Sequence, residues 1–289
     1  MLRKCRPVHH SKRINVFTMQ HKKLTQQQKE AYDRDGYLLI PFMFSPKEIE
    51  LLYGVAIHDD VISKKSYDRG DKEGFRTRLA LWYSLDNDIY SLLARSERIV
   101  SGVEMLLEGE PAHFHSKLMQ KEPKVGGAWE WHQDYGYWYR DGFLFPNMLS
   151  VLTALTPSNR ENGCLQVIRG SHKLGRVEHG FAGEQVGANQ ERVDEALKIM
   201  ELEYVEMNPG DTLFFHGNLL HRSDRNNSTE PRWSLISAYN RKDNKPYKEI
   251  HKSSYSSIDR VNDNAILEYQ GGSISEHADF LVKSPHREN

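Results

Sequence analysis

The chain has 289 residues, of which 38% are hydrophobic and 27% are charged, a composition typical of a globular protein. Its 39 Lys and Arg residues nearly balance its 40 Asp and Glu residues, and no basic stripe of the kind that binds nucleic acid crosses its body. No apolar run approaches the roughly 20 residues that a membrane-spanning helix needs, so we expect neither a nucleic-acid partner nor a membrane span. Composition does not set the oligomeric state.

The first 23 residues differ from the rest because they hold seven Lys or Arg residues and no acidic residue. This composition is typical of a disordered extension and also of a targeting peptide. The two cysteines, Cys5 and Cys164, are too few for a cysteine-based zinc cluster, and we expect no structural disulfide. We therefore expect an intracellular, cytoplasmic protein, with mitochondria and peroxisomes as the alternatives that the basic segment leaves open.

Residues 24–289 are expected to form one domain that begins with helices. A polar, helix-prone segment at residues 25–35 ends at Gly36, and the apolar run at residues 37–44 predicts a buried strand. Ser45 as N-cap, Pro46 at the first helical position and Glu48 at the third predict a helix that runs to about residue 58. A further helix is expected over residues 89–107, closed by Gly109.

After Pro111 the pattern changes to short strand-like runs separated by turn signals such as Asn162-Gly163. Many short strands at this spacing are typical of a β-sandwich or jelly roll. The fold class that we predict is therefore mainly β with flanking helices, of the jelly-roll or cupin-like kind. The expected strands are residues 115–120, 129–135, 149–155, 164–168, 201–207, 212–216, 219–223 and 232–239.

A His-x-Asp pattern, which could supply metal ligands, begins at His58, His132 and His277. Two histidines and one carboxylate can occupy one face of an octahedral Fe(II) and leave the opposite face open. On a β-strand, residues i and i+2 point the same way, so the pattern supplies two ligands there but not on a helix. His58 ends a predicted helix, and His277 is followed only by His286 as a third ligand. His132 and Asp134, on an expected strand, meet both demands.

The third ligand must come from a distant strand, and the candidates are His172, His179, His216 and His221. The first two fall in an expected turn and a polar loop. The last two are five residues apart on one strand-like stretch, so they face opposite sides of an unbroken strand. Ser223 shares a face with His221, and a hairpin would place Arg232 about opposite Ser223. A guanidinium and a hydroxyl beside the metal suit the far end of a dicarboxylate, which favours His221.

These motifs, in this order and spacing over residues 24–239, resemble the phytanoyl-CoA dioxygenase family. The segments that carry the resemblance are His132-Gln133-Asp134, Asn162-Gly163-Cys164-Leu165, Gly170-Ser171-His172-Lys173, Pro209-Gly210-Asp211, and His221-Arg222-Ser223 followed by Arg232. The resemblance implies a double-stranded β-helix that uses Fe(II), 2-oxoglutarate and O₂ to hydroxylate a substrate, with release of succinate and CO₂. One departure is Leu152, which stands where some members have Trp.

The resemblance also implies roles for single residues. His132, Asp134 and His221 would hold the iron, Arg232 and Ser223 would bind the distal carboxylate of 2-oxoglutarate, and Lys117 would be a further cosubstrate contact. Related halogenases lack the carboxylate ligand so that chloride can bind, and the presence of Asp134 therefore indicates hydroxylation.

Two questions stay open at this point. The substrate could be an acyl-CoA, a free acid, an amine or another small molecule. The aromatic residues around the metal motif could form core or a substrate wall with cation–π character. These residues are Trp129, Trp131, Tyr135, Tyr137, Trp138, Tyr139, Phe143 and Phe145.

The alternative function is a cupin-like metal protein without this chemistry, in which Arg232 and Ser223 would have no dicarboxylate to bind.

Overall fold

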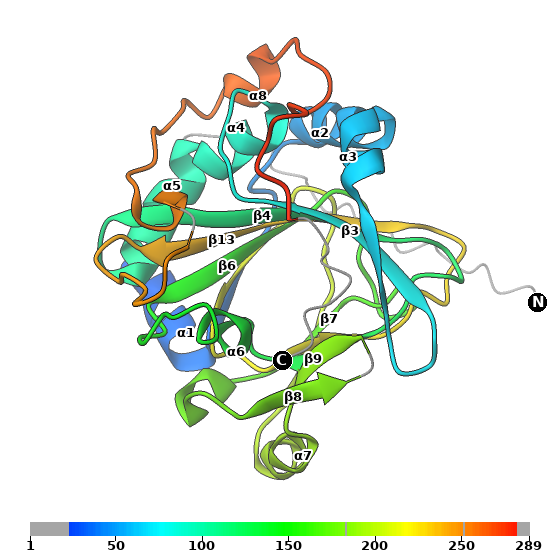
Figure 1. Ribbon diagram of the computed structural model, residues 1–289, viewed down its shortest axis with the longest axis vertical. Helices are drawn as coiled ribbons and strands as arrows, with labels where there is room; N and C mark the ends of the chain where they lie inside the picture. Colours follow the sequence, from blue (N-terminus) through cyan, green and yellow to red (C-terminus); the bar gives the residue numbers. More distant parts are fainter. Residues whose placement is uncertain (1–22, 183, 251, 282–289) are drawn as a thin grey trace, which may run out of the picture.

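The computed structural model describes residues 23–182, 184–250 and 252–281 (Figure 1). The predicted basic extension lies outside these residues apart from Lys23, and so does Cys5. Cys164 is a buried free thiol. Among the described residues, no helix has both the length and the apolar character that crossing a membrane requires.

The described residues form two large antiparallel sheets and a third, two-stranded sheet that is a β-hairpin. Figure 1 shows β4 (Pro111–Lys121), β13 (Arg232–Arg241) and β6 (Met148–Ala154) on one side of the interior and β7 (Leu165–Ile168) on the other. The larger sheet runs in the order β1 (Tyr37–Ile40), β11 (Thr212–His216), β6 (Met148–Ala154), β13 (Arg232–Arg241), β4 (Pro111–Lys121), β3 (Arg76–Trp82) and β2 (Tyr67–Gly70). The smaller sheet runs β10 (Leu202–Val205), β7 (Leu165–Ile168), β12 (His221–Ser223) and β5 (Trp129–His132), and the hairpin pairs β8 (His179–Ala182) with β9 (Gln185–Ala188). The predicted mainly β class with flanking helices is confirmed.

The first two helices begin as the sequence predicts. Before α1 (Gln26–Asp35), the Thr25 side chain accepts from the Gln28 backbone N–H, and the Gln28 side chain accepts from the Thr25 backbone N–H. Gly36 ends the helix in the left-handed region at φ 83°. In α2 (Pro46–His58), Ser45 and Glu48 form the same reciprocal pair. Most of the other helices are short: α3 (Asp60–Lys65), α6 (Asp134–Trp138), α7 (Gln190–Ile199), α8 (Ala265–Glu268), and 3₁₀ turns at Ser171–Leu174 and Lys252–Tyr255.

The single helix expected over residues 89–107 is wrong, because the chain forms α4 (Ile89–Arg95) and α5 (Glu97–Leu107) instead. Ser96 separates them with φ −58° and ψ 140°. Its hydroxyl donates to the Leu93 carbonyl at 2.8 Å, a local bond that competes with the helix, and it bridges to Val261. The strand expected at residues 37–44 likewise ends at Ile40, and Phe42 then takes a positive φ of 52°.

The two faces of the larger sheet serve different purposes. Alternate residues of a strand point to opposite faces, and in β4 Leu118 belongs to the core that packs against the helices. Met119 belongs instead to a second core, which holds Leu165 of the smaller sheet. Lys117 and Lys121, two residues either side of Met119, therefore face the interior between the sheets.

Candidate active site

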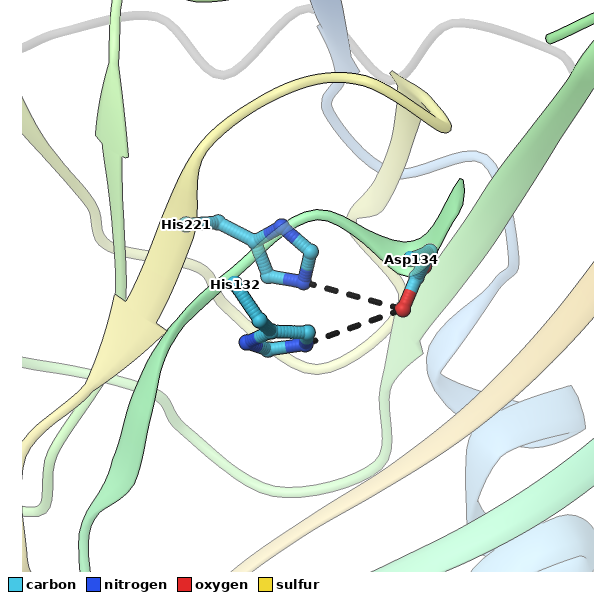
Figure 2. A group of neighbouring side chains, drawn as sticks. All are labelled: His132, Asp134 and His221. Atoms are coloured by element: carbon cyan, nitrogen blue, oxygen red, sulfur yellow. Dashed lines mark ion pairs between the residues drawn. The ribbon is translucent and has the colours of Figure 1, made fainter. Parts of the chain in front are cut away.

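His132, Asp134 and His221 meet in the interior, as Figure 2 shows. One potential ligand atom from each lies within 4.8 Å of the other two, and all three residues are buried. The Asp134 Oδ1 atom is 3.7 Å from His132 Nε2 and 3.9 Å from His221 Nε2. The two histidines are direct cross-strand partners at the ends of β5 and β12, and their ring centroids are 4.0 Å apart. The structure thus brings together the three residues that the sequence singled out.

The expected strand at residues 129–135 is wrong beyond His132, because Asp134 is the first residue of α6. Gln133 keeps an extended backbone, with φ −112° and ψ 133°, so the chain turns only after the second ligand. The buried Gln133 side chain explains the turn, since its amide donates to the carbonyls of Gly175 and Asn218, each at 2.7 Å. These bonds hold the motif to two loops rather than to a neighbouring strand.

Both imidazoles present the same nitrogen to the centre of the cluster. Nδ1 of His132 donates to the Glu130 carbonyl at 2.8 Å, and Nδ1 of His221 donates to the Leu219 carbonyl at 2.9 Å. The Nε2 lone pairs are therefore left free to bind a cation, and such backbone bonds fix the ring orientation. Burial lowers the pKa of His221 to about 3, so this imidazole is neutral at physiological pH.

Asp134 offers one carboxylate oxygen to the cluster and uses the other to anchor itself. The hydroxyl of Ser150, on β6 of the larger sheet, donates to Oδ2 at 2.5 Å. Burial alone would raise the pKa of Asp134, but the positive charge of Lys117 holds it well below its usual range. A donor set of two imidazole nitrogens and one ionised carboxylate is the one that Fe(II) sites with open positions use.

A cavity leads from the two histidines to the remaining candidate residues. Its polar lining consists of Lys117, His132, His221, Arg222, Ser223 and Arg232. The rest of the wall is apolar and includes Leu152, at the position where some members of the resembling family have Trp, and Phe215, whose ring centroid is 5.0 Å from that of His221. One cavity therefore contains every sequence-predicted site residue except Asp134.

Arg232 is a cation without a counter-ion at the far end of this cavity. It is 6% exposed, and among the described residues it forms no ion pair, while its Nε atom has no hydrogen-bond partner. One Nη1 bond goes to the carbonyl of Gly163. Burial lowers the pKa of the guanidinium to about 10. Because an unpaired buried charge is costly, this arrangement suits a site that an anion fills.

The expected hairpin that would place Arg232 opposite Ser223 is wrong. Ser223 lies on β12 in the smaller sheet and Arg232 on β13 in the larger sheet, so no ladder joins them. The intervening loop crosses from one sheet to the other, and the Asn226 side chain holds it by donating to Lys121 O at 3.0 Å and to Glu230 O at 2.8 Å. Ser223 and Arg232 reach the same cavity from opposite sheets.

The other histidine candidates have different partners. His216 accepts the Asn218 N–H at Nδ1, 2.9 Å away, and its ring lies 5.4 Å from that of His172. His179 accepts the Gln133 N–H at Nε2 with a distance of 2.9 Å, so it supports the metal motif from behind. Gly136 leaves room for this ring, because a Cβ atom there would lie 2.4 Å from His179 Nε2.

Sequence reasoning did not find Ser150 and Gln133, which support the candidate ligands, or Lys121, which donates to Ser223. Gln133 stands between two ligands, so its position was a usable signal. Ser150 and Lys121 lie on strands that the sequence does not show to be neighbours of the site. Of the aromatic residues, Tyr135, Trp138 and Phe143 pack into a buried cluster and Trp129 lines the cavity; this supports the core interpretation for the first three.

Known proteins resemble this chain in sequence and in fold. The family model described as phytanoyl-CoA dioxygenase matches residues 32–234, more than half of the chain. The ectoine dioxygenase of Halomonas elongata is 25% identical over 237 residues, covering 77% of this chain and 71% of the relative. The L-proline trans-4-hydroxylase of Streptomyces griseoviridis is 28% identical over 238 residues, covering 75% and 87%. The crystal structure of EctD from S. alaskensis with bound Fe has a TM-score of 0.68 at 22% identity, covering 89% of this chain and 92% of that chain. It shares the fold, and the predicted double-stranded β-helix is confirmed.

Proposed function

The chain belongs to the phytanoyl-CoA dioxygenase family, and we propose that it hydroxylates a small organic molecule or an acyl substrate with release of succinate and CO₂. It is a 2-oxoglutarate-dependent dioxygenase whose cofactors are Fe(II), 2-oxoglutarate and O₂. Bound Fe(II) supplies the activation of O₂ by which 2-oxoglutarate is oxidised to succinate and CO₂ and one oxygen atom enters a substrate C–H bond.

His132, Asp134 and His221 are the residues that would hold the iron. The donor set supports this role, because both Nε2 atoms and Oδ1 of Asp134 converge within 4.8 Å. Neutral His221 and ionised Asp134 have the protonation states that metal ligands need. The family's halogenating relatives lack the carboxylate, so the presence of Asp134 supports hydroxylation.

The observation that carries the proposal is the unpaired guanidinium of Arg232 in the cavity that starts at the two histidines. A planar guanidinium fork is a natural partner for a carboxylate in a buried site. A ligand that chelates the metal with its keto-acid end and carries a second carboxylate would neutralise Arg232. The same requirement disfavours a cupin-like metal protein without 2-oxoglutarate, which would keep this charge uncompensated.

Ser223 and Lys117 complete the proposed cosubstrate site. Ser223 lines the cavity beside Arg232 and would contribute a hydroxyl to the distal carboxylate. Lys117 lies on the same wall, and its charge acts on Asp134, so it would contact the cosubstrate near the metal. The apolar side chains between these points, among them Leu152, would exclude water from the reacting atoms.

The named relatives support a small substrate. One is a dioxygenase of ectoine and the other hydroxylates L-proline, and each aligns over about three quarters of this chain. Acyl-CoAs, free acids and amines are all candidate substrates, because the polar side chains of the cavity are assigned to the cosubstrate and not to the substrate.

The direct test is succinate production by the Fe(II)-loaded protein with a panel of acyl-CoAs, free acids and amines. Hydroxylated product should appear in proportion to succinate. His221→Ala should lose Fe(II) binding, whereas His216→Ala, five residues earlier and outside the cluster, should retain it. Iron-loaded protein that binds no 2-oxoglutarate and makes no succinate with any substrate would overturn the proposal.

A further inference from the structure

A second buried ammonium lies behind the far end of the cavity. Lys121, the last residue of β4, is fully buried, and its Nζ atom donates to Ser223 Oγ at 2.8 Å. It also donates to the carbonyl oxygens of Ser223, at 3.4 Å, and of Asp224. Lys121 is not part of the cavity lining. Its contact with the cavity runs through Ser223.

Lys121 is placed beside a charge of its own sign. It is the direct cross-strand partner of Arg232 in the β4–β13 ladder, and among the described residues neither side chain forms an ion pair within 4.0 Å. Burial lowers the pKa of Lys121 well below its usual value, and the charge of Arg232 lowers it further. Like charges directly opposite each other destabilise a sheet, and burial increases the cost. An anion bound at this end of the cavity would offset both charges.

The chemistry of the Lys121–Ser223 bond sets the direction of the Ser223 hydroxyl. In its protonated form the Lys121 amino group can only donate, and Ser223 Oγ then accepts from it. The hydroxyl hydrogen of Ser223 is then free to be donated to another group. Among the described residues, none accepts a hydrogen bond from it. Ser223 faces the cavity beside Arg232, where a carboxylate could accept this hydrogen.

We propose that Lys121 is a positioning residue that holds Ser223 as a hydrogen-bond donor to the distal carboxylate of 2-oxoglutarate. It would also place a second positive charge behind Arg232. This inference rests on the proposed function, because it assigns Lys121 to the same cosubstrate site. Lys121 could instead serve stability alone, by holding the strand to the carbonyls at residues 223 and 224. In that case its replacement would not weaken 2-oxoglutarate binding selectively.

The test compares two ligands that differ only at their far end. 2-Oxoglutarate and 2-oxopentanoate share the keto-acid group that would chelate the metal, but 2-oxopentanoate has a methyl group in place of the distal carboxylate. Their dissociation constants are measured by calorimetry on the full chain loaded with Mn(II). Lys121→Met should weaken 2-oxoglutarate binding by about tenfold, typical of one hydrogen bond to a charged group. It should leave 2-oxopentanoate binding unchanged.

Two further variants isolate the proposed route through Ser223. Ser223→Ala should weaken 2-oxoglutarate binding to a similar extent, and adding Lys121→Met to it should cause little further loss, because both changes remove one interaction. Lys124→Met is the matched control, since Lys124 also ties this strand end to the loop through a backbone carbonyl, that of Asn227, but does not contact Ser223. It should leave both affinities unchanged.

Equal weakening of both ligands by Lys121→Met, or unchanged 2-oxoglutarate binding, would overturn the inference. If Lys121→Met does not fold, Ser223→Ala decides, because an unchanged 2-oxoglutarate affinity there would also overturn it. Wild-type protein that binds no 2-oxoglutarate would instead remove the proposed function itself. Wild-type binding that depends on Arg232 but not on Lys121 would remove only the present inference.

Discussion

Arg232 is a buried cation whose replacement should separate the stability of the protein from its ligand binding. Burial lowers the pKa of this guanidinium from its ordinary value to about 10. At about 1.4 kcal/mol per pKa unit, the ligand-free fold carries a cost of about 3 kcal/mol for the charge. This cost is present in full at neutral pH, because the guanidinium is protonated both in the folded state and in the unfolded state.

Arg232→Met removes this charge and retains apolar volume. It also removes the hydrogen bond to Gly163 O, which is worth about 1 kcal/mol. The free energy of unfolding of the ligand-free protein should therefore rise by about 2 kcal/mol, or a few degrees in Tm. Binding of 2-oxoglutarate should weaken by about 100-fold, because a paired guanidinium–carboxylate contact is worth about 3 kcal/mol when one partner is removed.

The assay is a thermal melt without ligand together with calorimetric titration of 2-oxoglutarate into the Mn(II)-loaded protein. Arg222→Met is the control, because Arg222 lines the same cavity but already has partners, with Nε donating to Gln166 at 2.9 Å and the guanidinium over the Trp131 ring. The control should change ligand affinity much less. A lower Tm for Arg232→Met combined with unchanged 2-oxoglutarate affinity would refute the reasoning.

Three further changes test the support of the metal cluster and the buried histidines. Ser150→Ala removes the 2.5 Å bond to Asp134 and should weaken Fe(II) binding by about 10-fold to 100-fold in a chelator competition, with little change in the Tm of the metal-free protein. Gly136→Ala should push His179 off the Gln133 N–H and lower both the Tm and Fe(II) affinity, and adding His179→Ala should restore part of the loss. Burial lowers the pKa of His216 to about 4, below the unfolded value of 6.5, so its contribution to stability is present above pH 6.5 and is lost as pH falls toward 4. Urea unfolding should show a slope near 1.4 kcal/mol per pH unit from this residue, and His216→Asn should reduce it.

The features that the sequence predicts correctly depend on neighbours along the chain. The predicted capping residue Ser45 starts its helix because it bonds to a group three residues away. The split of the expected helix at Ser96 could not be predicted in the same way. It depends on a bridge to Val261, far along the chain, and on a side-chain bond to Leu93 that exists once the backbone bends.

The candidate site shows the same division. His132 and Asp134 are close in sequence, and a single extended residue, Gln133, suffices to aim both side chains at one point even though the strand ends between them. The sequence could place Ser223 near Arg232 only through a hairpin, and the hairpin is wrong because the two residues line one cavity from different sheets. The true route runs through Lys121, and finding it requires knowing which strands pair and which sheets face each other.

Polar groups of the proposed active site also form hydrogen bonds between the two sheets. Ser150 of the larger sheet donates to Asp134, which follows β5 of the smaller sheet, and Lys121 of the larger sheet donates to Ser223 of the smaller one. A ligand that chelates a metal held by His132 and His221 and pairs with Arg232 would add a third link of this kind. Ligand binding should therefore restrain the relative position of the sheets, and a gap opened between them would weaken the metal and the carboxylate sites together. The buried like charges of Lys121 and Arg232 therefore lower the stability of the ligand-free protein and favour the state in which bound cosubstrate links the two sheets.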